Sequence, residues 1–140
     1  MPHSFEIIVY TAAIEHMHYD VGLQSLYECA KLAVPGGILF LTGPNTPEDQ
    51  SGYDTQYKAH VYEWKRSELM DGLNKTGWDI LTEWGLVIDR KSLKDAGEKL
   101  GILPIIERLE KFIPKEWLLP VLALMFPKES KEIGFIARKR

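Results

Sequence analysis

The sequence predicts an α/β fold built on a largely parallel sheet, and two observations support this prediction. Phe5–Tyr10 and residues 38–42 are almost continuously apolar and rich in β-forming residues, the pattern of strands covered on both faces. Between them, residues 20–34 place apolar side chains at helical spacing, with Asp20 as a candidate N-cap. Strand, helix and strand in this order predict the right-handed parallel unit of α/β proteins.

The glycines of the stretch LAVPGGILFLTGPN have two interpretations, a turn or a phosphate-binding loop. Pro35 cannot continue a helix, and Gly36 and Gly37 tolerate positive φ. A phosphate loop follows a strand and opens a helix, whereas these glycines precede a strand. We therefore expect a turn that ends the helix and begins the second strand.

The rest of the chain predicts two further strands and several helices. Residues 45–58 are polar and turn-rich, which is typical of a functional loop or lid. A helix is expected over residues 66–76, a strand over 78–88 with a bend or bulge at Gly85, and a last strand over Glu132–Lys139. Between these strands, residues 91–130 form an expected helical insertion, with helical segments at 91–101, 104–113 and 117–126. Its apolar residues either pack on the sheet or cover an apolar substrate, a partner or a membrane surface.

Composition narrows the class of protein. The 140 residues are 45% hydrophobic and 26% charged with a formal charge of -3, so one globular domain is expected and nucleic-acid binding is disfavoured. Cys29 is the only cysteine, which excludes an intrachain disulfide and fits a cytoplasmic location. The first ten residues lack the basic start and cleavage site of a signal peptide, so none is expected, and no apolar run approaches the roughly 20 residues of a membrane span.

Four stretches in a fixed order carry a resemblance to a known family: FEIIVYTAAIEHM, LAVPGGILFLTGPN, HVYEWKRSELMDGLNKTGWDI and the terminal strand. This order resembles the second half of class I S-adenosylmethionine (SAM)-dependent methyltransferases. The resemblance implies a partial three-layer, Rossmann-like methyltransferase fold of about four strands, the last one antiparallel, with SAM as cofactor. A complete family domain orders its strands 3-2-1-4-5-7-6, and this chain would supply the last four.

The family's first half carries a glycine-rich loop and an acidic residue that hold the cofactor, and neither has a counterpart in this sequence. Phe5–Tyr10 would then be an apolar edge strand, which is a template for pairing with another chain. The expected partner is a second copy of the chain or a complementary N-terminal half. The alternative to an enzyme is a noncatalytic half-domain that binds a partner carrying the cofactor loop.

The resemblance also implies site residues at the carboxyl ends of the first two strands. Tyr10, Thr11, Ala12 and Glu15 are expected beside the methionine part of SAM. His16 is expected to face the transfer site, and either His16 or His60 is a candidate general base because imidazole titrates near neutral pH. The alternatives are that Glu15 and His16 cap a turn and that the histidines are structural or surface residues.

Three further residues are candidates for binding a small-molecule methyl acceptor: Asn45, Tyr57 and Trp64. Asn45 follows the second strand, and Tyr57 and Trp64 belong to an aromatic-rich stretch in or beside the expected lid. For Asn45 the alternative is a turn residue, and for Trp64 it is a packing residue before the helix.

A metal site and a different enzyme class are disfavoured by the sequence. Glu15, His16 and His18 lie close together, but helical residues two positions apart do not share a face, so we expect no metal site. A hydrolase is disfavoured because the chain lacks a Gly-x-Ser-x-Gly nucleophile elbow.

Overall fold

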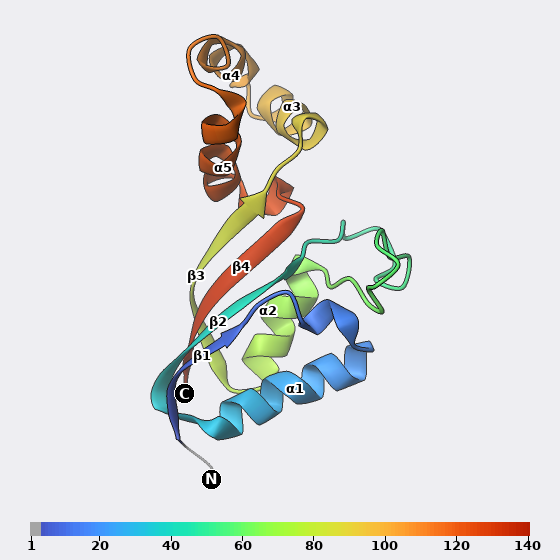
Figure 1. Ribbon diagram of the computed structural model, residues 1–140, viewed down its shortest axis with the longest axis vertical. Coiled ribbons are helices and arrows are strands. Elements are labelled where there is room, and N and C mark those ends of the chain that lie inside the picture. Colours follow the sequence, from blue (N-terminus) through green and yellow to red (C-terminus); the bar gives the residue numbers. More distant parts are fainter. Residues whose placement is uncertain (1–3) are drawn as a thin grey trace. The chain divides into compact units, whose positions relative to one another are not determined.

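The computed structural model describes residues 4–140, and its elements follow the predicted order (Figure 1). In chain order they are β1 (Phe5–Tyr10), the 3₁₀ turn η1 (Ile14–His16), α1 (Tyr19–Leu32), β2 (Ala33–Pro44), α2 (Arg66–Lys75), β3 (Trp78–Val87), α3 (Arg90–Lys99), α4 (Leu103–Leu109), α5 (Lys115–Met125), the 3₁₀ turn η2 (Pro127–Glu129) and β4 (Glu132–Lys139).

The four strands form one sheet in the order β1-β2-β4-β3. β1 pairs with β2 in parallel. The last strand is antiparallel to β3, because the Lys131 amide donates to the Val87 carbonyl and the Arg140 amide donates to the Gly77 carbonyl. The last four strands of the complete family fold lie in the order 4-5-7-6, and the order β1-β2-β4-β3 is the same. The predicted partial α/β fold is therefore confirmed.

The chain divides into two compact units, one formed by the chain up to Glu83 together with Gly134–Arg140, the other by Trp84–Ile133. In the first unit, α1 and α2 pack on the sheet through a fully buried apolar layer. Its fully buried members include Leu26, Leu39, Leu41, Leu69, Leu73, Phe135 and Ala137. The indole N–H of Trp78 donates to the Leu26 carbonyl at 3.3 Å, which joins the start of β3 to α1.

The prediction that β1 is covered on both faces is wrong for the described chain. Ile7 and Val9 are 61% and 68% exposed, whereas Ile8 and Tyr10 are half-buried. Alternate residues of a strand face opposite sides, so only one side of β1 is packed against the unit. An apolar strand face and the outer edge of β1 are therefore left uncovered by residues 4–140.

The predicted turn at Pro35–Gly37 is instead part of β2. The helix α1 ends at Leu32, and β2 begins at Ala33. Phe5 pairs with Ala33 while Ile7 pairs with Ile38, so two steps along β1 oppose five along β2. The extra residues form a bulge, and Gly36 adopts a φ of 80° that favours glycine.

The second unit is built around α3, α4 and α5. Its core consists of Ile88, Leu93, Ile106, Leu118, Leu122 and Ala123. The helix α4 ends at Leu109, earlier than expected. Asp89 caps α3 by accepting from the Ser92 amide, and the Lys131 ion pair, together with this bond, lowers the Asp89 pKa to about 2.

Gly85 has a packing role in this unit. A Cβ there would lie 2.3 Å from the Ala123 carbonyl oxygen, so only glycine fits. The described helices include none with the length and apolar character that a membrane crossing requires.

Two helical glycines of the first unit give a matched test of its packing. A Cβ on Gly22 would lie 2.7 Å from the Trp64 ring, whereas one on Gly72 would come no closer than 3.4 Å to Leu26. Alanine is favoured over glycine in a helix by about 1 kcal/mol, so Gly72→Ala is expected to raise the free energy of unfolding by up to about that amount. Gly22→Ala is expected to lower it by about 1–2 kcal/mol, because overpacking outweighs the gain. Urea unfolding measures both, and equal stabilities would contradict the packing of α1 on Trp64.

Candidate functional site

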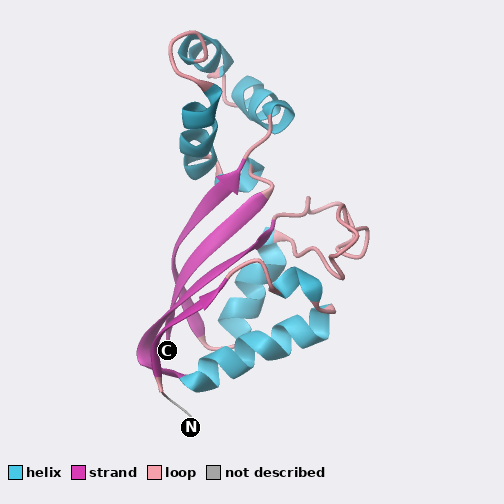
Figure 2. Ribbon diagram, in the orientation of Figure 1, coloured by secondary structure: helices cyan, strands magenta, loops and turns pink. Residues whose placement is uncertain are grey.

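The candidate site lies where β1 and β2 end, which is where open α/β sheets bind ligands. β1 continues through Thr11, Ala12 and Ala13 into η1, and β2 continues into a long irregular segment that reaches α2 (Figure 2). Ala12 turns the chain with a φ of 48°, a left-handed conformation that costs a non-glycine residue about 1–2 kcal/mol. Its amide donates to the Thr42 hydroxyl at 3.3 Å, so the ends of the two strands are joined here.

Backbone hydrogen bonds attach η1 to the segment before α2. The Glu15 carbonyl accepts from the amides of Val61 and Tyr62 at 2.8 and 3.2 Å. The ring Nδ1 of His16 donates to the Ala59 carbonyl at 2.8 Å. These bonds bring the two predicted catalytic histidines together, with the His16 and His60 ring centroids 5.3 Å apart in an edge-to-face arrangement.

A buried carboxylate orients His60. The Nδ1 of His60 lies 2.7 Å from Oε1 of Glu63, which is 4% exposed. The same oxygen accepts from the Gln56 amide at 2.9 Å. Since a carboxylate only accepts, Nδ1 of His60 carries the proton, and Nε2 presents a lone pair. A ring held in this way can accept a proton or bind a metal through Nε2.

The predicted acceptor-binding residues have different surroundings. Tyr57 is exposed, and its ring centroid lies 5.0 Å from that of His60, so the structure brings these two residues together. Asn45 is half-buried directly after β2.

Trp64 is fully buried, stacks on Tyr19 at 4.6 Å and lies against Gly22. The burial of its ring fits the packing alternative for Trp64. Its neighbour Tyr62 is also buried, and its hydroxyl donates to Glu68 at 2.7 Å. Burial and this carboxylate raise the Tyr62 pKa.

Of the predicted cofactor-binding residues, Tyr10 directs its side chain into the unit. Its hydroxyl pairs with the Ser25 hydroxyl at 2.7 Å, and burial raises the Tyr10 pKa. Thr11 and Ala12 are exposed. The side chain of Glu15, the fourth of these residues, is buried.

The structure assembles one cluster that the sequence did not predict. Glu15, His16 and His60 each present a potential ligand atom, and these three atoms lie within 4.8 Å of one another. The sequence disfavoured a metal site of Glu15, His16 and His18, and the His18 ring indeed lies 6.4 Å from that of Tyr53 and outside the cluster. The sequence signal for an oriented His60 is the acidic residue Glu63 three positions later, and the structure shows that its carboxylate is buried and bonded to this ring.

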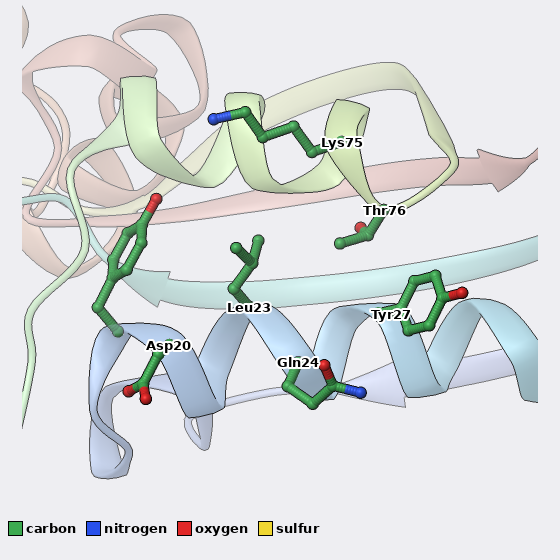
Figure 3. A pocket seen from close by; sticks show the side chains of 7 residues that line it. Asp20, Leu23, Gln24, Tyr27, Lys75 and Thr76 are labelled. Atoms are coloured by element: carbon green, nitrogen blue, oxygen red, sulfur yellow. The ribbon is translucent and has the colours of Figure 1, made fainter.

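A hollow of about 430 Å³ lies apart from these residues, on the first unit. Side chains of α1 and α2 and the following Thr76 line it, including Leu23, Tyr27 and Lys75 (Figure 3). None of the predicted site residues is among its lining residues. The hollow is therefore not the predicted cofactor or acceptor site.

No protein-family profile and no curated protein matches the sequence. Solved structures do match. The [4+2]-cyclase SpnF is 14% identical with a TM-score of 0.59, covering 99% of this chain and 52% of its own. The YcgJ protein from Bacillus subtilis is 20% identical with a TM-score of 0.57, covering 99% and 65%.

A third match is the 1,6-didemethyltoxoflavin-N1-methyltransferase of Burkholderia thailandensis, solved with 1,6-didemethyltoxoflavin and S-adenosylhomocysteine (SAH). It is 14% identical with a TM-score of 0.58, covering 99% of this chain and 45% of its own. Methyltransferases recur among the matches. The chain has the class I methyltransferase fold.

The match extends over about half the length of the first of these structures, SpnF. A [4+2]-cyclase and methyltransferases share this fold, so the fold alone does not define the reaction.

The Glu63 carboxylate is expected to hold the segment that carries His60. Glu63→Ala removes the acceptor for His60 and for the Gln56 amide, and a lost buried acceptor costs about 1–3 kcal/mol. We expect lower stability in urea and faster amide hydrogen exchange over residues 52–63. The matched control is Glu28→Ala, which removes an exposed pair with Lys31 and is expected to leave both unchanged. Unchanged exchange in Glu63→Ala would contradict this role.

Proposed function

We propose that this chain is the acceptor-side half of a SAM-dependent methyltransferase acting on a small molecule. The strand order carries the proposal: β1-β2-β4-β3 corresponds to the second half of the class I fold, and the histidine cluster follows β1 at the ligand end of the sheet. The first half, with its glycine-rich loop, would lie against the outer edge of β1, on the same polypeptide or on another.

The exposed apolar side of β1 supports the proposal that a further part of the fold packs against this strand. Phe5, Ile7 and Val9 are all at least half exposed on this strand, and its outer edge has no neighbour among residues 4–140. An apolar edge strand in water is a site for strand pairing. The proposed partner is therefore the complementary half-domain, or a second copy of this chain.

SAM, when bound, supplies an electrophilic methyl group. On this chain the exposed Thr11 and Ala12 would approach its methionine part through their backbone, with Tyr10 and Glu15 fixing the ends of the turn. Small residues here allow close approach of the ligand to the backbone. Holding donor and acceptor in line can supply roughly 7–11 kcal/mol of the barrier at most.

The acceptor would lie beside His16, His60 and Tyr57, with Asn45 at the end of β2. Methyl transfer to a protonated oxygen or nitrogen releases one proton, and Nε2 of His60 has the lone pair to accept it. Glu63 would stabilise the resulting imidazolium through the hydrogen bond to Nδ1. His60 is thus the better oriented of the two candidate bases.

The second candidate is a noncatalytic half-domain that binds a partner. The exposed edge of β1 favours it equally, because a partner-binding strand and a split enzyme need the same surface. The two differ in whether the assembled protein binds the cofactor and transfers a methyl group.

Isothermal titration with SAM and SAH, with adenosine as a control ligand, tests the proposal. We expect no heat from the isolated chain, because the glycine-rich loop is not part of it, and saturable SAH binding once a complementary half is present. Heat from the isolated chain would overturn the need for a second half. An assembled complex that binds neither ligand at high micromolar concentration would overturn the methyltransferase proposal and favour the noncatalytic half-domain.

A charged residue on the edge strand tests the pairing surface. Val9→Lys places a lysine at an exposed edge position, a feature that blocks strand addition in natural sheets. We expect loss of self-association or of partner binding in sedimentation experiments, with an unchanged midpoint of thermal unfolding. The control is Ile105→Lys, a similarly exposed apolar position in the second unit. Equal association by wild type and Val9→Lys would exclude β1 as the interface.

A further inference from the structure

Glu15, His16 and His60 form a compact group of potential metal ligands. One ligand atom from each lies within 4.8 Å of the other two. Glu15 and His16 come from η1, and His60 comes from the segment before α2, so the group exists only in the folded chain. Proximity alone does not make a metal site, and the hydrogen bonds of each member decide whether its ligand atom is available.

The carboxylate of Glu15 is buried without compensation. Glu15 is 5% exposed, and its Oε2 has no hydrogen-bond partner within residues 4–140. A buried carboxylate oxygen without a partner carries a large desolvation cost, and native structures leave such atoms unpaired only rarely. A cation held beside this oxygen would supply the missing interaction.

Both histidines are held with their other nitrogen bonded. Nδ1 of His16 donates to the Ala59 carbonyl at 2.8 Å, and Nδ1 of His60 donates to the Glu63 carboxylate at 2.7 Å. Each ring is therefore the tautomer whose Nε2 has a free lone pair. Metal-binding histidines use this arrangement, in which a carbonyl or carboxylate fixes the ring through the opposite nitrogen.

We propose that Glu15, His16 and His60 bind a divalent first-row transition metal such as Zn²⁺, Mn²⁺ or Co²⁺. Two imidazole nitrogens and one carboxylate are a ligand set that suits these ions better than Ca²⁺, and three protein ligands leave coordination positions open. His16 is exposed, so an ion can enter from solvent. Glu63 and the Ala59 carbonyl orient the ligands without binding the ion.

The metal site changes the role of the histidines within the proposed methyltransferase, and this step alone rests on that function. A bound divalent ion would hold the acceptor oxygen in an open position and lower the pKa of its hydroxyl. The proton that the acceptor hydroxyl loses would then go to solvent or to a bound hydroxide rather than to His60. The affinity of the site for a metal does not depend on SAM.

Cobalt absorption and calorimetric titration with Zn²⁺ on the full metal-free chain test this proposal. We expect one ion per chain and a visible Co²⁺ spectrum that Zn²⁺ abolishes. Glu15→Gln and His60→Asn are expected to weaken binding at least about 100-fold, and Glu63→Gln by about 10-fold, since outer partners of ligands contribute about 10–100-fold. His18→Ala, a neighbouring histidine outside the cluster, is the matched control and is expected to bind as wild type.

Circular dichroism and thermal unfolding without metal establish that each variant is folded. If Glu15→Gln does not fold, His16→Asn decides, because this side chain is exposed. No metal uptake by wild type, or wild-type affinity in Glu15→Gln or His16→Asn, overturns the site, as does an equal loss in His18→Ala. Because no SAM is present, a negative result leaves the methyltransferase proposal with a histidine base, and failed SAH binding leaves the metal site intact.

Discussion

The candidate site depends on one junction, the pair of backbone hydrogen bonds that the Glu15 carbonyl accepts from Val61 and Tyr62. This junction, together with the His16 bond to the Ala59 carbonyl, joins η1 to the segment that carries His60. Two residues after Tyr62, Trp64 is fully buried against Gly22 of α1, and this packing holds the junction in place. The packing of an aromatic side chain in the core therefore sets the position of two polar rings at the surface.

The order and type of most elements follow from patterns that are local in sequence. The 3.6-residue period before Pro35 and the partial alternation over Glu132–Lys139 predicted a helix and a strand close to their observed bounds. The sheet order followed only from the resemblance, because strand neighbours are set by contacts distant in sequence. The bulge at Pro35–Gly37 escaped prediction because a bulge and a turn use the same residues.

The site was predicted less completely, for a physical reason. From the sequence, His16 could be considered as a metal ligand only together with its neighbours, such as His18. In the structure, His16 is hydrogen-bonded to Ala59, 43 positions away. Spacing rules apply within one helix or strand, and η1 is a single 3₁₀ turn that pairs with an irregular segment. Burial could not be predicted from the sequence either. The residues around Trp64 do not show whether its indole lies in the core or lines a pocket, and those around Glu15 do not show whether its carboxylate is buried or exposed.

Two uncompensated features of the first unit lie close together in the chain. The apolar side chains of Phe5, Ile7 and Val9 are exposed on β1, and five residues after this strand the Glu15 Oε2 is buried without a hydrogen-bond partner among residues 4–140. Between them, Ala12 stores conformational strain at a φ of 48°, which persists only where the surroundings hold the backbone. A layer that pairs with β1 would hold Tyr10 and so the start of this turn, while an ion at Glu15 would hold its end. Strand pairing and ligand binding would thus act on the same strained turn from its two ends.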